Sequence, residues 1–249
     1  MRPGLVALQF LTRIPIAMDR APTGAELGGS ILWYPLVGLL LGAVLLGIQI
    51  LTAEMPAQIQ AILLLVGWVG LTGGLHLDGL ADTADGWAGG RGSRERTLEI
   101  MRDPRSGAMG VTALSLIVLA KYSALMILVG SEPAARLALL IVPVLGRTIL
   151  LVLFLTTPYA RSAGTSLAIS THLPRGPAAA VGIGTLTWIA MGMRGVGTWC
   201  VAAVLVVLLM VRASAMRRIQ GMTGDVAGAL VEVSEASALM TAAVVSASG

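Results

Sequence analysis

Three aspartates at the end of a long apolar run are the residues of this sequence best suited to chemistry. They lie in the segment Gly73-Gly74-Leu75-His76-Leu77-Asp78-Gly79-Leu80-Ala81-Asp82-Thr83-Ala84-Asp85-Gly86. The spacing of Asp78, Asp82 and Asp85 places them within about 60° of one another on a helix. Carboxylates on one face repel each other unless a cation lies between them. The cluster therefore predicts a site for Mg²⁺, or for Mn²⁺, together with substrate phosphates; the alternative is a solvated acidic face.

An arginine-rich turn follows the aspartates and offers a site for an anion. Its sequence is Arg102-Asp103-Pro104-Arg105-Ser106-Gly107-Ala108-Met109-Gly110. Ser93 can cap a helix that leads to this turn, and Pro104 disfavours helix at the residue before it. We expect Arg102 and Arg105 to bind phosphate or diphosphate oxygens, with Ser106 and Gly107 at the start of the next helix. The alternative is that both arginines only mark the membrane interface.

Two further residues near the same membrane face are candidates. The stretch Gly221-Met222-Thr223-Gly224-Asp225-Val226-Ala227-Gly228 can cap the last long apolar run and present Asp225 there, or it is a plain loop. His76 lies roughly opposite the aspartates on the same helix, as a hydrogen-bonded interfacial residue or as a base. With only two histidines and no His-Glu-x-x-His pattern, a zinc hydrolase has no support.

Four charged residues interrupt the apolar runs, and they are Lys121, Arg147, Glu232 and Glu235. Charges inside a membrane are costly, and they usually pair with one another or line a polar cavity. Glu232 and Glu235 share a helix face because they are three residues apart. We expect these glutamates to pair with Lys121 or Arg147, and direct contact with a substrate is the alternative.

The composition places these residues in a membrane protein. Apolar types make up 56% of the 249 residues, charged types only 12%, and the mean hydropathy is +0.86. Soluble domains contain roughly 25% charged residues, so a soluble enzyme, a coiled coil and a disordered tail are disfavoured. The lone Cys200 excludes a disulfide framework and a cysteine-based zinc site. The net charge of +4 does not indicate nucleic acid, because the basic residues flank apolar runs and form no stripe.

Runs of about 20 apolar residues can cross a bilayer as helices, and we expect about seven. Their ranges are 31–52, 58–77, 108–129, 134–157, 177–193, 196–213 and 226–247. The N-terminal run 5–12 is too short to span, so we expect an interfacial or re-entrant helix there and not a signal peptide. The sequence thus predicts one all-α, polytopic membrane domain over residues 1–249.

The arginines alternate between the two sides of these spans. One side receives Arg2, Arg13, Arg20, Arg91, Arg94, Arg96, Arg102, Arg105, Arg161, Arg175, Arg212, Arg217 and Arg218, and the other receives Arg136 and Arg194. The positive-inside rule places the first side in the cytoplasm, with the N-terminus inside and the C-terminus outside. The acidic candidates share that side, so we expect a cytoplasmic catalytic segment at about 76–107.

Several motifs occur in order over most of the chain. They are Phe10-Leu11-Thr12-Arg13-Ile14-Pro15, Tyr34-Pro35-Leu36-Val37-Gly38, the segment from Gly73 to Gly86, the segment from Met101 to Gly110, and Thr223-Gly224-Asp225. Together they resemble the cobalamin synthase family, the adenosylcobinamide-GDP ribazoletransferases. The aspartate segment followed by Arg-Asp-Pro-Arg-Ser-Gly is specific to that family, whereas residues 174–218 carry little that identifies it.

The resemblance implies a Mg²⁺-dependent transferase of late vitamin B12 assembly in a bacterial inner membrane. Such an enzyme joins adenosylcobinamide-GDP to α-ribazole, or to α-ribazole 5′-phosphate, and releases GMP. Its expected partners are these small molecules and the lipid bilayer, without nucleic acid. The resemblance leaves open a homo-oligomer or an association with other cobalamin-assembly enzymes.

The resemblance also implies roles for the candidate residues. Asp78 and Asp82 would be metal ligands, and Asp85 a third ligand or the base that takes the hydroxyl proton. Arg102 and Arg105 would stabilise the transferring phosphoryl group.

The remaining candidates have less defined roles under the same hypothesis. Asp103 and Asp225 would bind a second metal ion or orient the nucleophile. The weaker candidates for the site are His76, Arg13, Lys121, Arg147 and Glu232.

Three other classes of protein explain part of the pattern. A CDP-alcohol phosphotransferase performs the same chemistry, but its motif begins Asp-Gly-x-x-Ala-Arg, and here Asp82 and Thr83 replace the Ala and Arg. A membrane prenyltransferase normally carries two Asp-rich motifs, whereas this chain has one clear example. A transporter would suit the charges inside the spans, but aspartates and arginines on one membrane face suit catalysis better.

Overall fold

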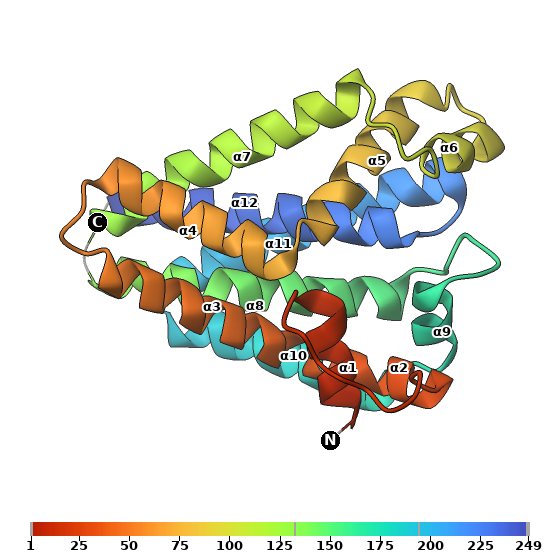
Figure 1. Ribbon diagram of the computed structural model, residues 1–249, viewed down its shortest axis with the longest axis horizontal. Helices are drawn as coiled ribbons and strands as arrows, with labels where there is room; N and C mark the ends of the chain where they lie inside the picture. Colours follow the sequence, from red (N-terminus) through yellow and green to blue (C-terminus); the bar gives the residue numbers. More distant parts are fainter. Residues whose placement is uncertain (1, 132, 194, 248–249) are drawn as a thin grey trace.

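Every regular element in the described part of the chain is a helix. The computed structural model describes residues 2–131, 133–193 and 195–247 (Figure 1). The elements are α1 Arg2–Leu11, α2 Gly24–Ser30, the short 3-10 helix η1 Ile31–Trp33, α3 Tyr34–Leu51, α4 Ala57–Thr72, α5 Leu75–Gly89, α6 Arg94–Ile100, α7 Ala108–Val129, α8 Pro133–Thr156, α9 Thr165–Thr171, α10 Arg175–Gly192, α11 Val196–Ile219 and α12 Gly224–Ala247. The all-α prediction is confirmed. Arg194, expected in a loop opposite the site, lies outside the described residues.

Five helical runs in the described residues are long and apolar enough to cross a membrane, and a sixth span results if α4 and α5 form one bent unit. The five are the continuous run Gly24–Leu51 and the helices α7, α8, α11 and α12. The polytopic architecture is confirmed, with fewer clear spans than expected. The expected span 177–193 coincides with α10, an 18-residue helix that is not among these spans because glycine and threonine dilute its apolar residues.

Helices α8 and α12 form the centre of the bundle. In the most apolar 18-residue stretch of each helix, 83% of the residues of α8 and 67% of those of α12 are buried, against 22% in α7. Helix α3 approaches α8 closely because Gly38 and Gly42 have no Cβ atoms, which would collide with the carbonyl oxygens of Pro143 and Leu140. Small residues spaced four apart commonly allow membrane helices to pack this tightly.

A sharp bend separates α4 from α5 and sets the direction of the aspartate helix. The sequence predicted one span over 58–77, but α4 ends at Thr72 and α5 turns away by 87°. Gly73 and Gly74 form the bend with φ angles of +66° and +70°, which residues with a Cβ atom rarely adopt. Helix α5 therefore leaves the direction of α4 and lies at one end of the bundle (Figure 1).

A network of four charged side chains lies inside the bundle. Lys121 of α7 donates to Glu232 and Glu235 of α12, each at 2.7 Å, and Arg147 of α8 pairs with Glu235. These side chains are at most 6% exposed. The Lys121 ammonium also lies 4.8 Å from the centroid of the Trp68 ring, which adds a cation–π contact. The prediction that the glutamates pair with Lys121 or Arg147 is confirmed, and the network joins α7, α8 and α12.

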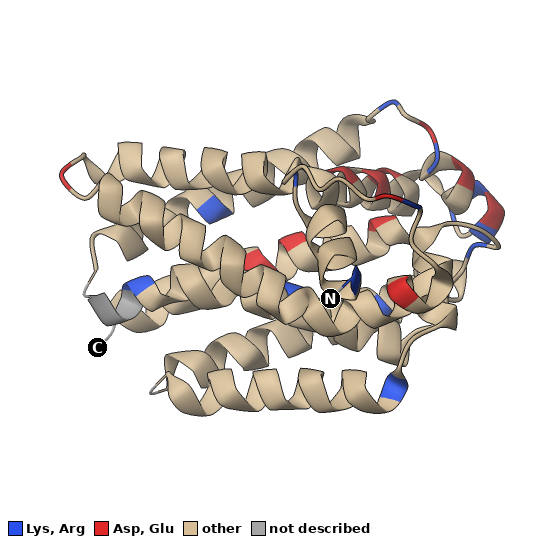
Figure 2. Cartoon of the chain, turned by 60° about the horizontal axis from the view of Figure 1, so that its bottom comes forward, with Lys and Arg blue, Asp and Glu red and all other residues tan. Residues whose placement is uncertain are grey.

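Charged residues gather at the end of the bundle that carries α5, α6 and α9, which we call the charged end (Figure 2). Some of its arginines connect helix termini that are far apart in the sequence. Arg94 donates to the carbonyl oxygens of Ile219 and Ala160, at 3.1 and 2.8 Å, and Arg218 donates to that of Trp87 at 3.1 Å. The carbonyl groups of Ile219 and Trp87 lie in the last turns of α11 and α5, where helix ends leave such groups without partners.

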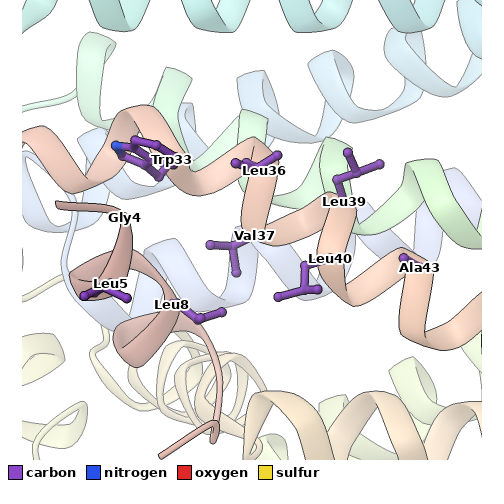
Figure 3. A pocket seen from close by; sticks show the side chains of 9 residues that line it. All are labelled: Gly4, Leu5, Leu8, Trp33, Leu36, Val37, Leu39, Leu40 and Ala43. Carbon is purple, nitrogen blue, oxygen red and sulfur yellow. The ribbon is translucent and has the colours of Figure 1, made fainter. Parts of the chain in front are cut away.

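The N-terminal run forms a short helix, as expected. Helix α1 covers Arg2–Leu11, too few residues to cross a bilayer, and it buries one face against the bundle. Its outer apolar residues help to line a groove of about 540 Å³, in which Leu5 and Leu8 face Val37 and Leu40 of α3 (Figure 3). An apolar face of this kind agrees with a helix that lies at the membrane interface.

Removal of one member of the buried network should destabilise the bundle. Lys121→Met leaves two buried glutamates against one arginine, and an uncompensated buried charge costs about 3–5 kcal/mol. We expect a lower thermal unfolding midpoint in detergent micelles, whereas the exposed control Glu95→Gln should match the wild type. The double variant Lys121→Met/Glu232→Gln restores charge balance and should recover part of the loss. Equal midpoints for Lys121→Met and the wild type would contradict the stabilising role of the network.

Candidate active site

Helix α5 carries the three aspartates, as predicted, and packs against both α7 and α12. Gly79 allows close approach to α12, because a Cβ atom there would lie 2.7 Å from the carbonyl oxygen of Asp225. Gly228 of α12 faces His76 in a similar way, with 3.2 Å from an added Cβ atom to the His76 Cα. The first turns of α5 and α12 are therefore in direct backbone contact.

Asp82 shows the electrostatic environment expected of a cation site. Burial, followed by the negative charges of Asp78, Asp225 and Asp85, raises its pKa to about 6, and Arg161 opposes this shift. Neither Asp78 nor Asp82 forms an ion pair within the described residues. A carboxylate held close to others without a counter-ion favours a bound proton or a bound cation.

Asp85 is engaged in a different contact. Its carboxylate oxygens accept the backbone N–H groups of Gly107 at 2.7 Å and Gly110 at 2.8 Å. Asp85 thus caps α7, which begins at Ala108, and satisfies amide groups that the start of a helix leaves free. The expectation that Asp85 binds metal or acts as the base stays a prediction.

The arginine turn lies beside α5. Ser93 caps the preceding helix as predicted, since its hydroxyl accepts the N–H of Arg96 at 3.2 Å. Arg105 donates to both carboxylate oxygens of Asp103, at 2.9 and 2.7 Å, and these bonds lower the pKa of Asp103 to about 2. Arg102 is exposed and forms no ion pair within the described residues.

A hollow of about 570 Å³ lies between the arginine turn and α5, and we call it the turn cavity. Its polar lining is Asp85, Asp103, Arg105, Ser106 and Gly107. The structure therefore brings most of the predicted phosphate-binding residues to one place. Because Arg105 is paired with Asp103, an anion that enters must share or displace this ion pair.

Arg161, which the sequence analysis counted only as an orientation marker, joins Asp225 at the site. Its Nη2 donates to Asp225 Oδ2 at 2.7 Å, and its side chain is 16% exposed. A backbone bridge positions it: Met222 N–H donates to the Pro158 carbonyl, and Ala160 N–H to the Met222 carbonyl, each at 2.8 Å. The link between α8 and α9 is thereby held against the start of α12.

The first turn of α12 is capped as predicted. The Thr223 hydroxyl accepts the N–H of Val226 at 3.2 Å and lies 3.2 Å from Asp225 Oδ2. Asp225 therefore has two side-chain partners, Thr223 and Arg161, in addition to its place beside α5.

Asp78 and Asp225 line a cavity of about 250 Å³, which we call the enclosed cavity, and Arg161 and His76 line it too. His76 is 4% exposed, and its Nδ1 has no hydrogen-bond partner among the described residues. An unpartnered buried nitrogen is costly, so a polar group in the cavity would relieve it. The helical period places His76 opposite the aspartates, yet His76 and Asp78 line the same cavity, which borders the first turn of α5.

Within the described residues, no three His, Cys, Asp or Glu side chains are arranged to hold a metal ion. The structure thus places Asp78, Asp82 and Asp225 close enough to influence one another without a complete set of protein ligands, and the metal site stays a prediction. Lys121, Arg147 and Glu232 belong to the intramembrane network and line none of the cavities described above.

Sequence reasoning missed Arg161 and Tyr159 as site residues. Both line the enclosed cavity, and burial raises the pKa of Tyr159, so its phenol stays protonated and can donate a hydrogen bond. The available signal was their position directly after the fourth expected span, on the arginine-rich side.

The fold and the site together define a polytopic, all-helical membrane protein with a carboxylate- and arginine-lined site at its charged end, suited to phosphate chemistry. A model of the cobalamin-5-phosphate synthase family matches residues 4–243. The chain belongs to this family.

Two relatives that are similar over nearly their whole length carry the name adenosylcobinamide-GDP ribazoletransferase. The protein from Pseudomonas syringae pv. syringae strain B728a is 48% identical over 245 residues, which cover 98% of this chain and 99% of the relative. The protein from Pseudomonas aeruginosa strain PAO1 is 47% identical over 247 residues, 98% of each chain. No solved structure matches this chain.

Loss of the Asp85 cap should loosen the start of α7. Asp85→Ala leaves the N–H groups of Gly107 and Gly110 without their acceptor, at a cost of about 1–2 kcal/mol. We expect faster hydrogen exchange at these two amides, measured by mass spectrometry on peptides covering residues 103–112. The exposed variant Glu99→Ala is the control, and unchanged exchange in Asp85→Ala would show that the cap does not hold the helix start.

Proposed function

We propose that the chain joins adenosylcobinamide-GDP to α-ribazole, or to α-ribazole 5′-phosphate, and releases GMP. Family membership over residues 4–243 makes it an enzyme of the adenosylcobinamide-GDP ribazoletransferase class. The observation that carries the proposal is the meeting of Asp78, Asp82 and Asp225 with Arg161 at one end of the bundle. The whole chain acts as one membrane-embedded transferase domain, with its catalytic segment at about 76–107.

The residues present fit Mg²⁺, with Mn²⁺ as the second choice. Asp78 and Asp82 offer unpaired carboxylates, and the raised pKa of Asp82 reflects burial and negative charge that a cation would offset. Mg²⁺ commonly takes one or two protein carboxylates and completes its shell with substrate phosphates and water, so a full protein cage is not required. Asp225 and Asp85 are the further ligand candidates. When bound, the ion supplies charge neutralisation at the diphosphate and the departing GMP.

The protein groups then hold the reacting parts in place. A ribose hydroxyl of the acceptor attacks the phosphorus on the corrinoid side, the bond to the bridging oxygen breaks, and GMP leaves with the electron pair. Arg102 and Arg105 stabilise the transferring phosphoryl group through hydrogen bonds that strengthen as charge develops. Asp225 orients the hydroxyl, and Asp103 positions Arg105 through their ion pair. A carboxylate of the cluster, with Asp85 as the predicted base, accepts the hydroxyl proton.

Asp82→Asn should abolish turnover while membrane insertion and folding stay intact. Loss of a metal ligand should lower the rate by about 100-fold or more, since even outer-shell changes cost 10–100-fold. The assay uses protein in liposomes with adenosylcobinamide-GDP, α-ribazole and Mg²⁺, and mass spectrometry detects the cobalamin product and equimolar GMP. EDTA should stop the reaction, whereas the exposed control Asp19→Asn should be fully active. Full activity of Asp82→Asn would remove Asp82 from the metal site.

We also propose that the charged end faces the cytoplasm of a bacterial inner membrane. The arginine distribution of the sequence and the gathering of charge at one end support this orientation (Figure 2). A membrane-impermeant maleimide should label Glu95→Cys in inverted vesicles but not in intact spheroplasts. The exposed Glu54, in the turn between α3 and α4, provides the matched variant Glu54→Cys, which should show the opposite pattern, and the buried Cys200 should not interfere. The reverse labelling would overturn the orientation.

A further inference from the structure

Three hollows adjoin one another beside α5 and share residues at their borders. The turn cavity shares Ser106 with a hollow of about 540 Å³, which we call the open cavity. The open cavity in turn shares Phe10, Leu75 and Asp78 with the enclosed cavity. Asp78 therefore borders both cavities, so a phosphorus atom held near its carboxylate can be reached from each side.

The enclosed cavity has the properties of a site for one nucleoside. Phe154, which is 2% exposed, and Tyr159 offer aromatic faces, and Ser166 offers a hydroxyl. Two buried polar atoms of the lining residues, His76 Nδ1 and Arg161 Nε, have no partner among the described residues, and a sugar hydroxyl bound beside them would supply one. Its volume of about 250 Å³ is below the roughly 300–1,000 Å³ of most ligand pockets, so it is far too small for a corrinoid nucleotide and suits the smaller of the two substrates.

The open cavity contains the guanidinium-bearing residue Arg13, whose position is set by backbone and side-chain contacts with the bend between α4 and α5. Arg13 lines this cavity and forms no ion pair within the described residues. Its backbone N–H donates to the Leu71 carbonyl at 2.7 Å, which docks it on the bend between α4 and α5. Its side chain lies across Gly73, where an added Cβ atom would come within 2.5 Å of the Arg13 Cγ. Gly73 thus has two roles: it turns the chain from α4 into α5, and its missing side chain leaves room for Arg13.

We propose that these two cavities are separate substrate subsites on either side of Asp78, and this assignment rests on the proposed function. The open cavity takes the diphosphate of the nucleotide-linked donor against Arg13. The enclosed cavity takes the acceptor, a nucleoside with an aromatic base.

The arrangement suits the geometry of the transfer. In-line displacement at phosphorus requires the nucleophile and the leaving group on opposite sides of the phosphorus. The acceptor oxygen forms its bond to phosphorus from the enclosed side, and the bond to the nucleoside monophosphate breaks towards the open side. The leaving group keeps the electron pair next to Arg13, and the hydroxyl proton passes to a carboxylate of the site.

The donor side is tested with Arg13→Gln. Loss of a charged hydrogen bond to phosphate should raise the donor KM by about tenfold or more and leave the acceptor KM within about twofold. Arg136→Gln, which removes a cation from outside the three cavities, should change neither constant. Arg13→Lys retains the charge and should recover part of the donor affinity.

Gly73 offers an independent test of the same subsite. Gly73→Ala should displace the Arg13 side chain and raise the donor KM in the same direction as Arg13→Gln. Gly195 also has a positive φ, of +89°, but open space around its Cβ position. Gly195→Ala therefore measures backbone strain alone and should leave the donor KM unchanged.

The acceptor side is tested with Phe154→Leu, which keeps an apolar side chain but removes an aromatic face. Isothermal titration of α-ribazole without donor should show affinity weakened by about three- to tenfold in Phe154→Leu and unchanged in Arg13→Gln. Titration of GDP with Mg²⁺ should show the opposite dependence. These binding measurements do not require turnover, and each variant is first checked for a thermal unfolding midpoint near that of the wild type.

Two results separate failure of the subsites from failure of the proposed function. An active wild type in which Arg13→Gln weakens α-ribazole binding instead of GDP binding, or weakens neither, would overturn the subsite assignment alone. A folded wild type that binds GDP and α-ribazole but forms no cobalamin product would refute the proposed function and leave the two binding sites in place.

Discussion

A charged side chain inside a bilayer must have a partner, and this constraint organises the bundle. Two cations and two carboxylates satisfy this constraint by pairing with one another, and they join α7, α8 and α12. They are Lys121, Arg147, Glu232 and Glu235. The same three helices border the charged end: α7 begins at the arginine turn, α8 leads to Arg161, and α12 carries Asp225 in its first turn. A shift of one helix along another would separate these pairs, so the network also sets how the site residues meet.

At the charged end, three aspartates have partners within the protein and two aspartates of α5 have none among the described residues. Asp85 caps α7, Asp103 holds Arg105, and Asp225 holds Arg161. Asp78 and Asp82 have no such partner in the described residues, and burial with neighbouring negative charge raises the pKa of Asp82. The structural contacts of Asp85, Asp103 and Asp225 fix the segments around α5. They thereby hold Asp78 and Asp82 in place. Within α5 itself, Asp85 has structural partners whereas Asp78 and Asp82 have none among the described residues.

Much of this arrangement follows from local sequence patterns. The helical period of the aspartates predicts α5, Ser93 and the stretch from Gly221 to Gly228 predict two helix caps, and the cost of buried charge predicts the pairing of Glu232 and Glu235. Other features escaped prediction because they depend on contacts between distant segments. The span expected over 58–77 is broken, since hydropathy averages over Gly73 and Gly74 and does not register their φ angles. Arg161 could not be told from other interfacial arginines before its contact with Asp225 was known.

The sequence by itself determined the membrane class, the helical architecture and the family, and it predicted candidate residues for metal and phosphate, because composition, period and motif are properties of neighbouring residues. Only the tertiary structure decided which of those residues are free and which are engaged. It also decided that His76 and Asp78 reach one cavity, and that Arg13 lies across the bend at Gly73. These outcomes depend on distances between helices that are far apart in the chain, and those distances are set by packing and by the pairing of buried charges.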